Sequence, residues 1–320
     1  MKIAIAGAGL TGTYLFRLLY DKGHEIDLFD HDPRTACGIS PCAWGTSRGF
    51  TDLLKVCGLD PTRYFLRQSD YVVMDGYRII ADLATFHKPY LIRDLRQDAN
   101  VNHSKLDVTK YDRVIDATGV TRAFLPAIRE DLLTPCVQYR IRTDRQLENR
   151  IQLGRIGFAW CFPLSENEYH IGCGSLNSNP RQILEALGWG QEGDLLCRCS
   201  GRIRLTGPQY SRPFVLDGPS CQIWGVGEAI GCVAPLAGDG IVPGMRSIEI
   251  LLRCWDHPVR YTEAILREFA WMEGERAVID KLRLGKSLGV SDAWILKKNS
   301  RRMGMKVGLR QALSLLDHLR

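Results

Sequence analysis

The sequence of 320 residues has no long hydrophobic run. No stretch approaches the roughly eighteen uncharged apolar residues of a membrane-spanning helix, which excludes a multi-span membrane protein. The opening residues, MKIAIAGAGL, lack the long apolar region and cleavage site of a secretory leader. Internal repeats and low-complexity segments are missing too, and 45% apolar and 24% charged residues exclude disorder and collagen. We therefore expect a cytoplasmic protein of about two domains.

The chain also lacks the paired cysteines of a structural zinc site. Among its 11 cysteines, Cys197 and Cys199 are the one tight pair, and no second pair stands at zinc-ribbon spacing. Because no secretory leader is evident, we expect free thiols rather than a disulfide framework, and no metal site.

Net charge is small over most of the chain and concentrated at the end. Residues 294–320 carry seven basic side chains against the single acid Asp317, which accounts for the whole excess of +6. Leucines at helical spacing follow in this segment: Leu309, Leu313, Leu316 and Leu319. This pattern indicates either a helix packed on its own domain or a basic amphipathic helix that contacts an anionic membrane surface peripherally. Nucleic acid is not expected, because the segment lacks interleaved aromatic residues that stack bases.

The strongest positive signal lies in the first thirty residues. A short apolar strand over residues 2–6 leads into Gly7-Ala8-Gly9-Leu10-Thr11-Gly12, which opens a helical pattern. A second strand over residues 25–29 ends at Asp30. A G-x-G-x-x-G turn between strand and helix brings backbone and a helix N-terminus to a pyrophosphate, and an acid after the second strand binds the ribose. The sequence therefore predicts a dinucleotide site here.

The later pattern departs from a simple nicotinamide dehydrogenase. Regular alternation stops after Asp30, and strand-like periodicity dominates the middle of the chain. Residues 114–119 form a further apolar strand ending in a small-residue turn. A late strand over residues 222–226 ends in Gly227-Glu228 and leads through residues 235–241 into a helix.

This order resembles the flavin-dependent hydroxylase and reductase superfamily, in which a sheet domain interrupts an FAD domain. The resemblance implies FAD, with Glu228 on the ribityl chain and the turn before the late helix against the flavin pyrimidine. It also places Arg48 at the pyrophosphate. The implied cofactor residues are Gly7, Gly9, Leu10, Thr11, Gly12, Asp30, Arg48, Ala117, Gly119, Gly227, Glu228, Pro235, Gly238, Asp239, Gly240 and Ile241.

Within that superfamily the chain is most similar to the geranylgeranyl reductase family. Three stretches carry the resemblance: a Cys/Gly segment over residues 37–45, F-A-W-C-F-P over residues 158–163 and P-L-A-G-D-G-I over residues 235–241. The family has Tyr where this chain has Phe158, and the chain is shorter than typical members. The resemblance implies reduction of carbon–carbon double bonds in a polyprenyl, geranylgeranyl-type lipid. The alternative is another FAD chemistry, such as hydroxylation or halogenation, on an apolar or aromatic substrate.

The fold expected is α/β, with a Rossmann-type FAD domain interrupted by a mixed or antiparallel sheet domain and followed by a helical segment. We expect the FAD domain to comprise residues 1–65, 101–125 and 218–256, and the sheet domain residues 66–100 and 126–217. Residues 257–320 form the C-terminal helical segment. Asp75-Gly76 is expected to make a tight hairpin turn.

Reduction of an unpolarised alkene needs a proton as well as a hydride. A thiol beside the flavin is one source, so Cys37 and Cys42 are the candidate catalytic residues, with His170 as an alternative. Trp160 and Phe162, together with Tyr139, are candidate walls of a substrate tunnel. No second nucleotide fingerprint is present, which leaves the electron donor open among a ferredoxin, a deazaflavin and NAD(P)H.

Overall fold

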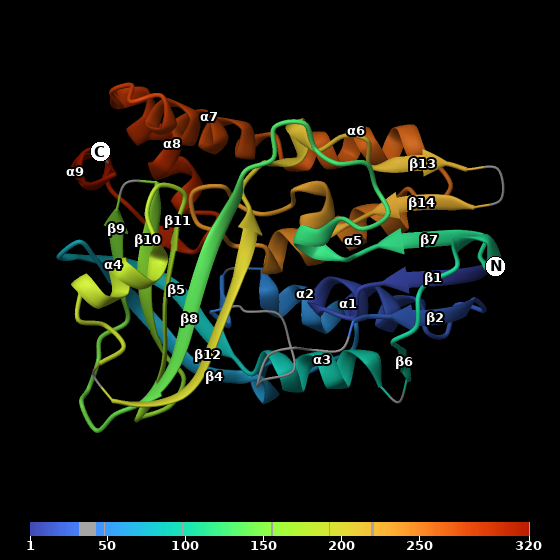
Figure 1. The fold of residues 1–320 in the computed structure, drawn as a ribbon, viewed down its shortest axis with the longest axis horizontal. Coiled ribbons are helices and arrows are strands. Elements are labelled where there is room, and N and C mark those ends of the chain that lie inside the picture. Colours follow the sequence, from blue (N-terminus) through green and yellow to red (C-terminus); the bar gives the residue numbers. More distant parts are fainter. Residues whose placement is uncertain are drawn as a thin grey trace.

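The computed structural model describes residues 1–31, 43–47, 49–97, 99–154, 156–191, 193–218 and 221–319. Cys37, Cys42 and Arg48, three of the residues singled out in the sequence, lie outside these ranges. Within them the strands form two sheets, which lie at opposite ends of the molecule (Figure 1).

The first sheet, called sheet A, is a mainly parallel sheet. Its order is β13 (Val215–Asp217), β14 (Gln222–Gly225), β7 (Arg113–Asp116), β1 (Lys2–Ala6), β2 (Glu25–Phe29) and β6 (Val101–Asn102). All neighbours are parallel except the β13–β14 pair. The short runs of Ile, Val and Ala in β1 and β7 are buried on both faces, as strands covered by helices must be.

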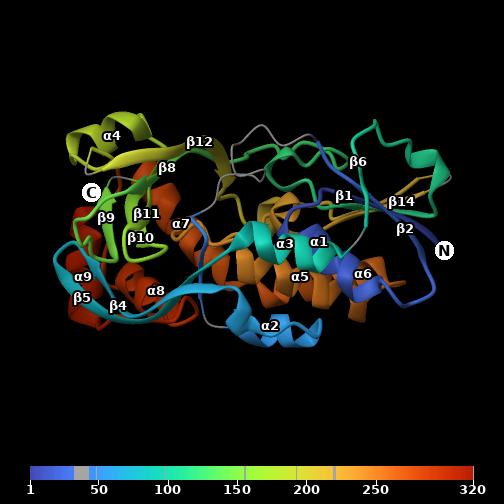
Figure 2. The same cartoon turned by 90° about the horizontal axis from the view of Figure 1, so that it is seen from below.

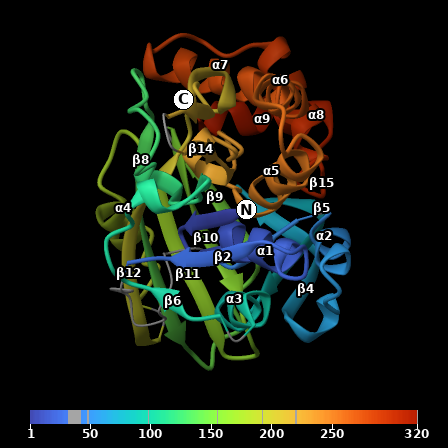
Figure 3. The same ribbon diagram turned by 90° about the vertical axis from the view of Figure 1, so that its right-hand side faces the viewer.

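Five helices and sheet A share one hydrophobic core. These helices are α1 (Leu10–Leu19), α2 (Phe50–Val56), α3 (Lys88–Arg96), α5 (Ile241–Arg253) and α6 (Pro258–Glu268). The expected division assigned residues 66–100 to the sheet domain, but α3 packs in this core instead. Its apolar stripe of Leu91, Ile92 and Leu95 lies against α1, beside β6 and away from the C-terminal helices (Figure 3).

The second sheet, called sheet B, is a long curled sheet. Its order is β12 (Asp194–Arg204), β8 (Leu133–Arg142), β11 (Glu168–Ser175), β10 (Gly157–Pro163), β9 (Arg150–Gly154), β4 (Phe65–Met74), β5 (Tyr77–Phe86) and β15 (Met305–Lys306), with β3 (Gly45–Thr46) also on β5. Its neighbours are antiparallel except β4 and β9. Asp75 and Gly76 both have positive φ between β4 and β5, which confirms the expected hairpin turn.

The two faces of sheet B bury different partners. α4 (Pro180–Ala186) covers the outer face over β8 and β11, and α8 (Val290–Ser300) and α9 (Leu309–His318) lie on the other side (Figure 2). α7 (Trp271–Arg283) joins them in a second core with β4, β5 and β9. Within the C-terminal segment, α6 and Met272 at the start of α7 pack in the core of sheet A, and the later part of α7 packs with α8 and α9 in the core of sheet B.

The terminal helix packs inward with three of the four leucines of the predicted spacing, Leu309, Leu316 and Leu319. Ala312, Leu315 and Leu316 are buried in the second core, whereas Leu313 is exposed. The apolar face of α9 is therefore covered by the protein itself and not free for a lipid surface. Among the described helices none is long and apolar enough to cross a membrane.

Candidate cofactor and substrate site

The turn from β1 to α1 has no room for side chains at two glycines. Gly7 has a φ of 107°, and a Cβ there would strike the carbonyl oxygen of Ala117 at the end of β7. A Cβ on Gly12 would strike the carbonyl oxygen of Gly7. The turn therefore packs closely against the end of β7 at Gly7 and against the first turn of α1 at Gly12. This is the packing that the G-x-G-x-x-G spacing predicts.

The opposite side of this turn is open. Among the described residues, no atom beyond the chain neighbours lies within 4 Å of the position that a Cβ on Gly9 would take, and no side chain caps the N-terminus of α1. Asp30, directly after β2, accepts hydrogen bonds from the N–H of Ala8 (2.9 Å) and of His31 (2.7 Å). The same space is therefore lined by the N-terminus of α1, the backbone of Gly9 and the carboxylate of Asp30. The helix end can bind an anion, and the carboxylate can accept hydrogen bonds from a sugar attached to it.

A buried aspartate that the sequence analysis did not single out shapes the neighbouring loop. Asp116 at the end of β7 accepts hydrogen bonds from Thr118 and from the N–H groups of Phe124 and Leu125. These bonds turn the chain so that Ala117 and Gly119 lie on the cavity wall. The acid at a strand end was visible in the sequence, but nothing there showed that it binds its own loop.

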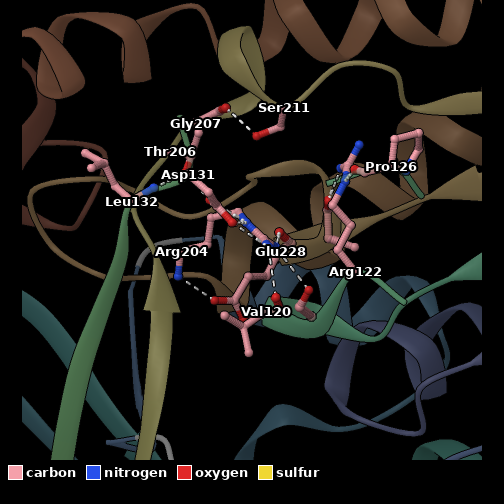
Figure 4. Close-up of polar contacts among 12 residues, drawn as sticks. Val120, Arg122, Pro126, Asp131, Leu132, Arg204, Thr206, Gly207, Ser211 and Glu228 are labelled. Atoms are coloured by element: carbon pink, nitrogen blue, oxygen red, sulfur yellow. Dashed lines mark hydrogen bonds and ion pairs between the residues drawn. The ribbon is translucent and has the colours of Figure 1, made fainter. Parts of the chain in front are cut away.

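Glu228, in the turn after β14, is held by sheet B. Its Oε1 accepts the backbone N–H of Arg204 at 2.8 Å (Figure 4). Burial raises the pKa of Glu228, and the Arg204 contact and the positive charge of Lys88 oppose this effect. Lys88 begins α3 and lines the same cavity. Sequence reasoning missed it, because one lysine at the start of a helix carries no signal of its own.

Arg204 ties three loops together at the end of β12. Its guanidinium donates to both carboxylate oxygens of Asp131 at 3.0–3.2 Å, and the side chain is buried. It also donates to the carbonyl oxygens of Gly119 (3.1 Å), Val120 (2.8 Å) and Glu228 (2.9 Å), as Figure 4 shows. The loop after β7 and the turn after β14 are therefore fixed to sheet B by one side chain.

A second arginine locks the same region from behind. Arg122 donates to the carbonyl oxygen of Pro126 at 2.7 Å (Figure 4). It also donates to those of Pro213 (2.8 Å) and Ala229. Burial lowers its pKa to about 10, and the nearby charge of Arg204 adds to the effect. Two buried guanidinium groups thus hold the loops from which the cavity wall is built.

The turn before α5 is built around Asp239. Its two carboxylate oxygens accept the N–H of Ile241 (3.0 Å) and the hydroxyl of Ser47 (3.1 Å). The backbone of Ala234 donates to the carbonyl of Asp239, and Gly238 donates to that of Ala234. Within the part of the chain that the structure describes, Asp239 is the side chain that binds the first turn of α5, so a second helix N-terminus opens on the same cavity.

One cavity of about 1420 Å³ connects these features. It runs from Asp30 past Gly9, Gly119 and Glu228 to Gly238. Its far end is an aliphatic chamber whose wall contains Met74, Leu83, Ile151, Leu153, Ile156, Ile203, Leu205, Leu236, Ile279, Leu282, Leu296, Met303, Met305 and Leu319. Pockets for small ligands usually hold about 300–1,000 Å³, so this space suits a large cofactor together with a substrate.

The aromatic residues expected on the tunnel wall lie on two different faces of sheet B. Trp160 and Phe162 on β10 line the cavity together with Phe158, because alternate side chains of a strand face the same side. Tyr139 on β8 faces the other side, where it packs with the α4 core and over Gly190. The expectation for Tyr139 is therefore wrong.

His170 does not line the cavity. It is buried against Trp44, and its Nδ1 lies 3.2 Å from the carbonyl oxygen of Ala43. Burial lowers the pKa of His170 to about 4, so the ring is neutral near pH 7. It fixes the start of β3 to sheet B, which is a structural role.

The residues present fit FAD. The cavity has an anion-binding helix end beside a bare turn, an acid for a ribose, and a second helix end beside the aromatic wall of β10. These suit the pyrophosphate, the adenosine and a broad planar ring system respectively. Of the expected cofactor residues, all that lie in the described ranges either line this cavity or stand in its turns, as Gly12 and Gly227 do.

Comparison with known proteins places the chain by its fold. No protein-family model matches it. It is similar to an uncharacterized protein of Methanocaldococcus jannaschii, at 24% identity over 87% of this chain and 91% of that protein.

Solved structures resemble the whole chain. A geranylgeranyl bacteriochlorophyll reductase-like protein from Thermoplasma acidophilum matches with a TM-score of 0.74 and 15% identity, over 98% of this chain and 95% of that one. A flavin-dependent halogenase from Xanthomonas campestris matches with a TM-score of 0.68 and 12% identity, over 99% and 94%. A tryptophan 6-halogenase from Streptomyces toxytricini gives 0.63 and 13%, over 99% and 90%.

The chain therefore has the fold of the FAD-dependent oxidoreductases, and the expected fold class is confirmed. Within that fold it is similar both to a reductase-like protein and to halogenases.

Proposed function

We propose that the protein is an FAD-dependent oxidoreductase that reduces carbon–carbon double bonds of a polyprenyl, geranylgeranyl-type lipid. The observation that carries the proposal is the aliphatic chamber that continues the cofactor cavity. From α7 to the end of the described chain, its wall contains the polar side chains of Glu275 and Ser300, and the other members are Ile, Leu and Met. A long hydrocarbon chain matches such a wall, whereas a polar substrate would leave its hydrogen bonds unmade.

When bound, reduced FAD supplies a hydride to the alkene. The chain's own part in the proposal is to position and to exclude water. Gly9 and the N-terminus of α1 would hold the pyrophosphate, Asp30 the ribose, and Glu228 the ribityl chain, with Lys88 adding positive charge beside them. The N-terminus of α5 would stabilise negative charge on the flavin. Trp160 and Phe162 would cover the substrate.

The experiment is an anaerobic single turnover. The protein is loaded with FAD, reduced with dithionite, and mixed with a geranylgeranyl lipid or its saturated counterpart. We expect the flavin absorbance to return with the unsaturated lipid alone, and the product to gain two hydrogen atoms per reduced bond. Flavin that stays reduced with the lipid would contradict the proposal.

A variant that fills the chamber tests where the lipid binds. Leu296→Trp should keep FAD affinity and lose the lipid-dependent return of absorbance, because Leu296 lines the chamber. Leu284→Trp is the matched control, because Leu284 is 69% exposed at the end of α7. Lipid turnover by Leu296→Trp at the wild-type rate would place the substrate elsewhere.

Halogenation or hydroxylation is the second candidate, because the halogenases share this fold at TM-scores of 0.63–0.68. Product mass separates the two. Oxygen or halogen incorporated in air would favour the second candidate, and added hydrogen without oxygen favours the first.

A further inference from the structure

Glu275 is a buried carboxyl between the α5 turn and the aliphatic chamber. It lies on α7, is 3% exposed, and lines the cavity. Its Oε2 accepts the backbone N–H of Leu236 at 3.1 Å. Leu236 belongs to the turn that precedes α5, so this one bond connects a C-terminal helix to the proposed flavin turn.

No described basic residue forms an ion pair with Glu275. On its own helix, the guanidinium of Arg276 is turned to Asp280 (3.0 Å) and to the carbonyl of Thr206 (3.3 Å). Beyond α8, the guanidinium of Arg302 lies over the ring of Trp271 at 5.3 Å.

The other charged and polar groups on the packed elements are also occupied. Asp239 of the turn binds Ser47 and the N–H of Ile241. Lys281 of α7 and Asp292 of α8 form their own ion pair at 2.7 Å. Asn299 of α8 is the exception, because its side-chain amide donates a hydrogen bond to the Glu275 carboxylate.

Burial therefore decides the protonation of this carboxyl. It raises the pKa of Glu275 to about 7, against the smaller opposing effects of the Leu236 N–H, Asn299 and Arg302. The carboxyl accepts the N–H of Leu236 through Oε2 and a second hydrogen bond from Asn299, and it has no ion-pair partner among the described residues.

We propose that Glu275 holds, and delivers to the substrate, the proton that reduction of a double bond consumes; this role rests on the function proposed above. One alkene carbon gains a hydride, which reduced FAD supplies. The π bond breaks, and its electron pair forms the second new C–H bond with the proton of Glu275. The O–H bond of the Glu275 carboxyl breaks, its electrons stay on the carboxylate, and water restores the proton afterwards.

The other acids on the described cavity wall are less suited. Burial raises the pKa of Glu228 too, but its Oε1 accepts the Arg204 N–H and it lies near the charge of Lys88, and both contacts oppose the effect of burial. Asp239 uses both oxygens as acceptors. Burial raises the pKa of the Cys136 thiol to about 12, which makes it a much weaker acid than Glu275.

The first test needs neither cofactor nor lipid. Infrared spectra of the wild-type protein should show a protonated-carboxyl band that disappears as pH rises through about 7. The band should be missing in Glu275→Gln and present in Glu273→Gln, whose parent side chain is exposed on the same helix. A wild-type protein in which no carboxyl titrates near 7 would overturn the proposal, even if Glu275→Gln failed to fold.

The second test is the anaerobic single turnover. For the wild type, the rate should fall about tenfold per pH unit above 7, since the protonated fraction falls in that proportion. Glu275→Gln should bind FAD as tightly as the wild type, react on the order of 10²-fold more slowly and lose this pH dependence. Glu273→Gln should match the wild type.

The two proposals fail in different ways. A wild-type protein that never reoxidises with lipid overturns the function and this role with it. Wild-type turnover together with an unchanged rate and pH profile in Glu275→Gln overturns the role alone.

Discussion

Replacing Arg204 by Met removes the side chain that joins the two sheets beside the cofactor cavity. The Met side chain is similar to Arg in length and apolar volume. The backbone N–H of residue 204, which donates a hydrogen bond to the Glu228 carboxylate, remains. It loses the guanidinium bonds to Asp131 and to the carbonyls of Gly119, Val120 and Glu228. Asp131, whose side chain is 18% exposed, then keeps Thr206 as its remaining described side-chain partner.

The magnitude follows from this burial. Removing one partner of a buried ion pair costs about 3–5 kcal/mol, because the other charge is left unpaired. We therefore expect Arg204→Met to lower the free energy of unfolding by about 3–5 kcal/mol. Removing both charges in Arg204→Met/Asp131→Leu should cost about 2 kcal/mol less than the sum of the single changes, since neither charge is then left alone.

The assay is urea unfolding of the two single variants and the double variant, together with FAD titration of each. Arg198→Met is the matched control, because Arg198 is exposed on the same strand, and it should change stability by no more than about 0.5 kcal/mol. FAD affinity should fall in Arg204→Met, because the Gly119 and Glu228 loops lose their common anchor. Additive costs, or an Arg204→Met protein as stable and as tight for FAD as the wild type, would refute this reasoning.

Two further predictions concern the cofactor contacts. Gly12→Ala should destabilise the protein by more than about 1 kcal/mol, because the added Cβ strikes the Gly7 carbonyl. Gly9→Ala should leave stability unchanged and weaken FAD binding, because its Cβ enters the open space. Urea unfolding with FAD titration checks both, and equal stability of the two variants would contradict the packing argument. Lys88→Met should weaken FAD binding about tenfold at low salt and less at high salt, since it removes a charge that lines the cavity. Lys55→Met is the control, because Lys55 is exposed on α2. Equal FAD affinity of the wild type and Lys88→Met at low salt would show that Lys88 does not contribute to FAD binding.

The glycine turns at the strand ends could be predicted from the sequence because their geometry is local. Gly7 and Gly12 are required within a few residues of the strand and helix that they join, so their spacing alone is informative. Asp30 follows from the same unit, since the ends of β1 and β2 meet at one edge of the sheet. The turn before α5 is local in the same way, because the Asp239 carboxylate accepts the N–H of Ile241, two residues later in the chain.

The chamber could not be predicted, because its wall is assembled from distant segments. Helical periodicity shows that α7 and α9 bury one face, but it does not show against what. The leucine spacing placed Leu313 inward, whereas Ala312 and Leu315 face the core. Glu275 in a helical pattern is typical of a solvated face until the Leu236 contact is known.

The strand order of sheet A has a consequence for the synthesis of the protein. β1 pairs with β7, which is made after β4 and β5, and β7 pairs with β14, which is made after most of sheet B. Until the ribosome has passed Gly225, the buried residues Val114 and Ile115 of β7 form an uncovered apolar edge. Incomplete chains should therefore aggregate or require chaperones, and added FAD should not rescue them, because the nucleotide pocket closes only with the last third of the polypeptide.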